Sequence, residues 1–221
     1  MSSWLRRFLV GMTILPVLTV PVMAQGPYVG YQWHTFFGGD PNEAATLPAT
    51  AVDASGNLYL TGTTQFPWDE YGNPGGATNQ LAHEAYLTKV SPTGQLLWSK
   101  FYVGIDAYGR SWIQGELRPV AITLDSSGNI YIAGAGKIEN DGTNFSSFVM
   151  ETDPDGNTIW GANFGGQSYL NTTVYGLTYD PVQNWVYVTG MAAGSWDGGQ
   201  PLANGLTLPT NGASAMFILQ V

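Results

Sequence analysis

The sequence predicts an all-β fold built from three repeated units, each with four strands. Three observations lead to this expectation. First, 29 glycines and 13 prolines among 221 residues interrupt the chain too often for long helices. Second, short runs rich in Tyr, Val, Ile and Leu lie between turn residues, as is typical of strands. Third, the same segments recur in order, so that matching tryptophans at positions 33, 98 and 160 lie 62 to 65 residues apart.

The first recurring segment predicts a hairpin of two strands. Residues 52–62 recur as 124–134 and, less faithfully, as 179–190. In the sequence Asp-x-x-Gly-Asn the aspartate caps the turn, and the glycine takes the positive φ that other residues resist. In the third copy Pro181-Val182-Gln183-Asn184 replaces the Gly-Asn turn. Each copy should therefore place a tight turn between its first and second strands.

The second recurring segment predicts a further pair of strands. Residues 85–94, followed by Trp98, recur as 147–156, followed by Trp160, and each tryptophan opens a final strand. The pattern of that final strand also occurs before the first unit, while the third unit stops after its third strand. The expected units are 49–103, 119–165 and 174–221, with 31–37 as the spare outer strand.

Units of this length suit the blades of a β-propeller, whose four strands run from the axis outward. Three such blades make a half or partial propeller. In each blade the tight turns should fall on one face of the disc and the long connections on the other. Because function in rigid scaffolds usually resides on loops, the loop-rich face is the one expected to bind a ligand.

The repeats resemble the SBBP repeats of bacterial β-propellers. The resemblance rests on Asp-x-x-Gly-Asn-x-Tyr-x-x-Gly, Ala-Tyr-Leu-Thr-Lys-Val-Ser-Pro-Thr-Gly and Trp-x-x-x-Phe-x-Gly. It covers residues 31–221, and it is weaker in the third unit, where the Gly-Asn turn is replaced. The resemblance implies an exported or surface protein, and it carries over no catalytic residue.

Residues 1–24 are expected to be a secretory signal peptide. Two arginines precede the apolar run 8–20, and Ala24 completes a small-residue cleavage pattern that makes Gln25 the new N-terminus. The alternative is a retained anchor, but a membrane-spanning helix needs about 20 apolar residues, and two prolines interrupt this segment. The chain 25–221 is therefore expected to be secreted, periplasmic or on the cell surface, with no membrane span after cleavage.

The composition excludes several classes of function. Seven Lys and Arg face sixteen Asp and Glu, a formal net charge of −9, so nothing favours binding to nucleic acid or to an anionic membrane. Without cysteine there is no disulfide scaffold, cysteine–zinc site or thiol catalysis. Neither His34 nor His83 has a second histidine at metal-ligand spacing, so both are expected to be structural or solvated.

The candidate ligand-binding residues lie in the long connections. An aspartate follows seven residues after each glycine taken to end a second strand, Gly62, Gly134 and Gly190, and a tryptophan precedes it twice. An indole beside a carboxylate suits a sugar, since CH groups stack on the ring while the carboxylate accepts hydroxyl hydrogen bonds. The alternative is that these residues stabilise turns and cover blade edges. Together with an arginine-bearing loop, they give the candidates Trp68, Asp69, Asp141, Trp196, Asp197, Arg110 and Trp112.

No catalytic residue, metal site or cofactor is expected. The segment 153–157 resembles the start of a calcium loop, but it lacks the downstream bidentate glutamate, which leaves calcium as an alternative. The expected function is non-enzymatic binding of a glycan, a peptide or a surface partner. The other reading is a propeller hydrolase or lyase that acts on carbohydrate or lactone, with loop carboxylates as acid and base.

The number of units also predicts a partner. Propellers typically have four to eight blades, and three cannot easily surround an axis. If the 221 residues are the whole product, we expect a two-fold homodimer that forms one six-bladed disc, in which strand 31–37 of each subunit completes the third blade of the other. The alternative is that the sequence is a truncated part of a larger propeller, with further blades after Val221.

Overall fold

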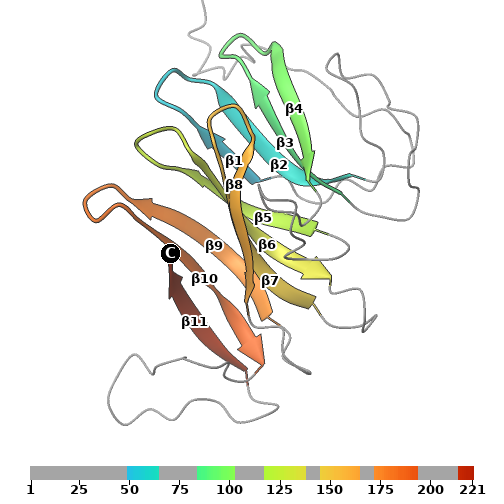
Figure 1. Ribbon diagram of the computed structural model, residues 1–221, viewed down its shortest axis with the longest axis vertical. Coiled ribbons are helices and arrows are strands. Elements are labelled where there is room, and N and C mark those ends of the chain that lie inside the picture. The colour runs from blue at the N-terminus through green and yellow to red at the C-terminus, as the bar shows by residue number, and fades with distance from the viewer. Residues whose placement is uncertain (1–48, 65–83, 103–116, 138–144, 165–171, 194–213) are drawn as a thin grey trace, which may run out of the picture. The chain divides into compact units, whose positions relative to one another are not determined.

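The computed structural model describes residues 49–64, 84–102, 117–137, 145–164, 172–193 and 214–221. These residues form eleven β-strands in three antiparallel sheets, and none of them is helical (Figure 1). All of them belong to the compact unit Trp33–Val221. Within them no helix is long and apolar enough to cross a membrane. The expected all-β class is therefore confirmed, with three antiparallel sheets.

The strands follow one another in the same order in each sheet. Sheet 1 contains β1 (Ala49–Val52), β2 (Leu58–Thr64), β3 (Glu84–Val90) and β4 (Leu96–Tyr102). Sheet 2 contains β5 (Leu117–Leu124), β6 (Ile130–Lys137), β7 (Phe145–Thr152) and β8 (Thr158–Phe164). Sheet 3 contains β9 (Thr172–Asp180), β10 (Trp185–Ala193) and β11 (Ser214–Gln220). Each strand pairs with its neighbour in the sequence, so each sheet is a meander.

The turn after the first strand of each sheet forms as the sequence predicts. Gly56 adopts a φ of +80°, and its counterpart in sheet 2 a φ of +85°. Asp53 Oδ1 accepts hydrogen bonds of 2.9 Å from the backbone N–H groups of Ser55 and Asn57. In sheet 3, where the Gly-Asn turn is replaced, Asn184 takes the left-handed conformation instead, with a φ of 57°. Asparagine adopts this conformation more readily than most residues, so the turn survives the substitution.

The repeated glycines at 62, 134 and 190 do not end their strands, and this expectation was wrong. Strands β2, β6 and β10 continue for two or three residues beyond them. A Cβ on Gly134 would lie 2.1 Å from the carbonyl oxygen of Arg118, and a Cβ on Gly190 would lie 2.2 Å from that of Thr173. Both glycines lie beside a shift in strand register. Glycine is therefore required there because the neighbouring backbone comes close, as is usual at a β-bulge.

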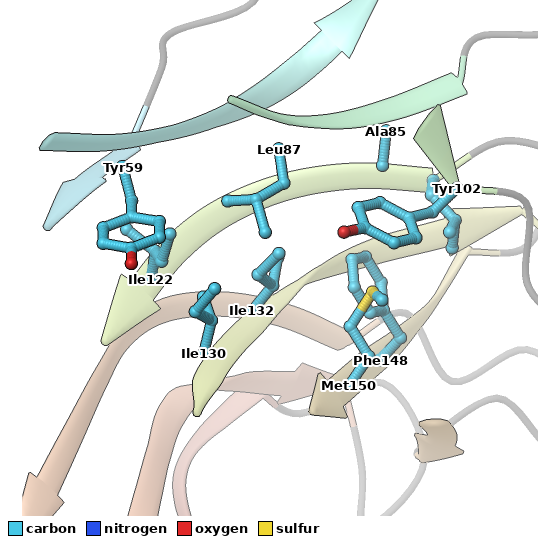
Figure 2. Close-up of a cluster of buried hydrophobic side chains, with 10 residues drawn as sticks. Tyr59, Ala85, Leu87, Tyr102, Ile122, Ile130, Ile132, Phe148 and Met150 are labelled. Carbon is cyan, nitrogen blue, oxygen red and sulfur yellow. The ribbon is translucent and has the colours of Figure 1, made fainter. Parts of the chain in front are cut away.

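Successive sheets pack face to face in chain order. We call the face that carries Tyr59, Tyr131 or Tyr187 the front face of its sheet, and the opposite face the back face. The front face of sheet 1 packs on the back face of sheet 2, as Figure 2 shows. The buried cluster between them consists of Tyr59, Ala85, Leu87, Tyr102, Leu117, Ile122, Ile130, Ile132, Phe148 and Met150. Each large apolar side chain buried in this way contributes about 1.5–3 kcal/mol to folding.

The front face of sheet 2 packs on the back face of sheet 3 in the same manner. The buried centre of this second cluster is formed by Ala133 and Val149 from sheet 2 and by Val174 and Val188 from sheet 3. Half-buried aromatic side chains extend it, among them Phe164 and Phe217, whose rings meet edge to face at 5.7 Å. The two inter-sheet contacts thus use equivalent faces of the repeated unit.

The tight turns and the long connections lie at opposite ends of each sheet. Because neighbouring strands are antiparallel, the turns of sheet 1 at 53–57 and 91–95 lie at one end, which we call the hairpin end (Figure 1). Strands β2 and β4 finish at the other end, the loop end, where they lead into 65–83 and 103–116. The strands of sheets 2 and 3 alternate in the same way.

Candidate functional site

The candidate ligand-binding residues all lie outside the described residues. They are Trp68, Asp69, Arg110, Trp112, Asp141, Trp196 and Asp197. The signal segment 1–24, the spare strand 31–37 and both histidines also lie outside them. What the structure gives is the position of the strand ends on either side of the candidates. Thr64, Tyr102, Lys137 and Ala193 end the strands that precede these segments, and each is at the loop end of its sheet.

Buried hydroxyl groups join successive sheets at the first residues of β5 and β9. Thr63 Oγ1 at the loop end of sheet 1 donates a hydrogen bond of 3.4 Å to the carbonyl oxygen of Leu117, the first residue of β5. Ser147 Oγ in sheet 2 donates to Thr172 Oγ1 at 2.9 Å, and Thr172 is the first residue of β9. A buried polar group that loses its hydrogen-bond partner lowers the stability of the fold by about 1–3 kcal/mol, so these two hydrogen bonds are strongly favoured. The first residues of β5 and β9 are thereby tied to the preceding sheet.

Sheet 1 carries a charged and aromatic cluster towards its hairpin end. Lys89 Nζ lies 3.9 Å from Asp53 Oδ2 and 5.0 Å from the ring centre of Tyr59. The Tyr59 hydroxyl donates to Asp53 Oδ2 at 3.3 Å, and the Tyr59 ring meets Trp98 edge to face at 6.1 Å. Partial burial acts to raise the pKa of Asp53, but hydrogen bonds, chiefly from Asn57, outweigh it and hold this pKa below its ordinary value. Burial is the main cause of the raised pKa of Tyr59.

Sheet 2 has the same cluster with the opposite charge at one position. Glu151 occupies the register position of Lys89, opposite Tyr131, and accepts a hydrogen bond from Trp160 Nε1. Burial first, and the charge of Glu151 next, raise the pKa of Tyr131. This position holds lysine in one repeat and glutamate in the next, and each has a local partner: Lys89 pairs with Asp53, and Glu151 accepts a hydrogen bond from Trp160. The cluster is therefore structural, and sequence reasoning did not single it out.

The segment 153–157 forms a third capped turn. Asp153 Oδ1 accepts hydrogen bonds from the N–H groups of Asp155 and Asn157, at 2.9 and 2.8 Å, and Oδ2 accepts one from the Asn157 amide at 2.8 Å. Asp53 and Asp125 bond in the same pattern. These hydrogen bonds give Asp153 the same turn-forming role as Asp53 and Asp125. Among the described residues, no group of three or more His, Cys, Asp or Glu side chains could hold a metal ion.

The turn 153–157 also contacts β4, the outer strand of sheet 1. Tyr102 Oη at the end of β4 donates a buried hydrogen bond to the carbonyl oxygen of Gly156. A Cβ on Gly156 would lie 2.9 Å from Lys100 Cγ and 3.0 Å from two ring atoms of Trp98. Burial, with the charge of Asp153 as the smaller cause, raises the pKa of Tyr102. The contact fixes sheet 2 against sheet 1, and no sequence signal pairs two residues 54 positions apart.

Comparison with known proteins adds no relative to this picture. No family model matches the sequence, and a search of curated proteins finds no significant match. The resemblance to SBBP repeats therefore stays a prediction from the motifs.

Proposed function

We propose that this chain is an exported, non-enzymatic β-propeller repeat protein of the SBBP type. On this proposal each sheet is a blade, and a glycan, a peptide or a surface partner binds across the loop end. The observation that carries the proposal is the front-to-back packing of three meander sheets in chain order. Radial repetition of such sheets is the architecture of a propeller.

The division between the two ends of the sheets supports binding at the loop end. The hairpin end is closed by short turns whose aspartates are occupied by backbone hydrogen bonds. The loop end instead leads into long segments that contain Trp68–Asp69 and Trp196–Asp197. Tryptophan beside aspartate offers a stacking face and a hydrogen-bond acceptor, which together suit a sugar ring. The signal pattern of residues 1–24 supports export, to the periplasm, the cell surface or the medium.

The competing function is a hydrolase or lyase acting on carbohydrate or lactone. Such an enzyme needs two titratable groups placed to act as acid and base. Among the described carboxylates, Asp53, Asp125 and Asp153 accept hydrogen bonds within turns, and Glu151 accepts one from Trp160. On this alternative, the acid and the base would be carboxylates of the long segments.

Glycan and peptide arrays probed with the mature protein test the proposal. We expect binding that the double variant Trp68→Ala/Trp196→Ala abolishes while circular dichroism remains unchanged. The matched control is Val182→Ala, which alters an exposed apolar side chain in a turn at the hairpin end and should bind as the wild type does. Release of reaction products from an array ligand would overturn the non-enzymatic reading. Equal binding by the double variant would exclude these tryptophans from the site.

A further inference from the structure

Two sheets carry a β-bulge at the same place in their first strand. In sheet 3 the register of β9 and β10 shifts between Thr189 and Gly190, and Tyr175 is the extra residue of β9. In sheet 2 the corresponding bulge of β5 has Val120 as its extra residue. Tyr175 is 65% exposed and Val120 is 44% exposed, although both lie within a strand. Bulges often re-aim a side chain beside a functional site, and both of these side chains reach solvent.

The backbone that carries Tyr175 is closely held. A Cβ on Gly190 would lie 2.2 Å from the carbonyl oxygen of Thr173, so β9 and β10 are in close backbone contact at the bulge. Val174, which precedes Tyr175, is buried in the cluster between sheets 2 and 3. Because this backbone is already fixed, a ligand that contacts Tyr175 does not have to order it, and less binding energy is lost.

The exposure of the bulge residue does not depend on what covers sheet 3. Sheet 2 lies between sheets 1 and 3 and packs against both of them. Val120 nevertheless remains exposed in sheet 2, at the position equivalent to Tyr175. An exposed side chain at this bulge is therefore a property of the repeated unit.

The two bulges lie on neighbouring strands. The first strands of successive sheets lie beside one another, β5 beside β1 and β9 beside β5. On the proposed architecture these strands surround the axis of the propeller. Strands β5 and β9 begin at the loop end, and Val120 and Tyr175 lie in the first half of each. Both side chains thus lie on the part of the first strands that is nearer the loop end.

An exposed tyrosine at this place suits a sugar ring. The CH groups of a sugar can stack on the phenol ring, and the hydroxyl can donate and accept hydrogen bonds. Thr173, two residues earlier on β9, adds a second exposed hydroxyl, and Val120 adds aliphatic surface on the neighbouring strand. None of these three side chains is charged, which favours an uncharged ring as the part of the ligand that they contact.

We propose that Tyr175 binds a sugar ring of a glycan ligand beside the first strands of sheets 2 and 3, and that Val120 borders the same site. The inference rests on the proposed function, because it assigns one contact of the ligand that binds at the loop end. It also narrows that ligand from a glycan, a peptide or a surface partner to a carbohydrate.

An oligosaccharide array and a peptide array, both probed with the mature protein, test the inference. Tyr175→Ala should weaken binding to the oligosaccharides that the wild type binds by at least about tenfold, as expected for a central aromatic contact. Tyr175→Phe keeps the ring and should lose less. The matched control is Ile159→Ala, because Ile159 is the exposed extra residue of a bulge in the outer strand β8 and should leave binding unchanged. Circular dichroism confirms that all three variants are folded.

The arrays separate failure of this inference from failure of the proposed function. If Tyr175→Ala binds oligosaccharides as tightly as the wild type, the inference is overturned while binding by the propeller stands. Binding of the wild type to peptides alone has the same consequence, because the inference requires a carbohydrate. A wild-type protein that binds neither array contradicts both.

Discussion

The hydroxyl of Tyr102 donates a 2.8 Å hydrogen bond to the carbonyl oxygen of Gly156, and so ties β4 to the β7–β8 turn of the next sheet. The bond is buried and spans two sheets, which are otherwise joined mainly by apolar packing. It fixes where the turn lies along β4, because a hydrogen bond is directional and apolar contact is not.

Replacing Tyr102 by phenylalanine is expected to lower the free energy of unfolding by about 1–3 kcal/mol, because the carbonyl of Gly156 is left buried without its donor. The measurement is urea unfolding of the mature protein. Tyr175→Phe removes a hydroxyl from an exposed tyrosine and should change stability by less than about 0.5 kcal/mol. Equal stability of Tyr102→Phe and the wild type would show that the bond does not hold the sheets together.

Gly134→Ala is expected to destabilise the fold by about 3 kcal/mol, because its Cβ would collide with the backbone carbonyl of Arg118 at 2.1 Å. Gly62→Ala provides the comparison. There the Cβ would meet the side chain of Tyr86, at 2.8 Å from its hydroxyl, and a side chain can move more easily than a backbone. The midpoint of thermal unfolding should fall further for Gly134→Ala. The reverse order would contradict the close approach of β5 to β6 at this bulge.

Asp153 should make stability depend on pH in the acid range. Partial burial acts to raise its pKa, but hydrogen bonds from Asn157 and Asp155, with the charge of Lys100, hold it below the ordinary 3.8. A carboxyl group whose pKa is lower in the folded state contributes stability that is present above about pH 4 and lost as the pH falls through the folded pKa. The urea midpoint of the wild type should therefore fall more steeply below pH 4 than that of Asp153→Asn. The control is Asp155→Asn, which removes one negative charge from the same turn and leaves the Asp153 carboxylate in place as the hydrogen-bond acceptor. If the urea midpoint of Asp153→Asn falls with pH as steeply as that of the wild type, the prediction is refuted.

Export predicts a defined N-terminus. When the full-length chain is produced in a bacterium with a secretory pathway, mass spectrometry of the exported protein should find Gln25 as its first residue. Replacing Ala24 by a bulky residue such as tryptophan should block cleavage and leave the precursor in the membrane fraction. Exported protein that retains residues 1–24 would contradict the signal peptide.

The sequence predicted the strands and turns well because these depend on local chemistry. Capped turns at Asp53 and Asp125 follow from side chains that bond their own backbone, and repeated segments fold alike because their local sequences are alike. The sequence did not show that Gly134 lies at a β-bulge inside β6 and not at the end of the strand. A bulge depends on the neighbouring strand and leaves no local pattern in the sequence. The contact between Tyr102 and Gly156 could not be predicted either, because it is set by how two sheets pack. The candidate residues of the long segments, such as Trp68 and Asp197, remain predictions from spacing.

A crystal structure of the mature protein with a ligand identified on the arrays would show at which end of the sheets the ligand binds. We expect the ligand to contact segments 65–83 and 194–213 at the loop end, with the indole of Trp68 or Trp196 against it. We also expect the tight turns at the hairpin end, such as 53–57 and 125–129, to be free of ligand. A ligand bound at those turns, or on the front face of sheet 3, would contradict this expectation.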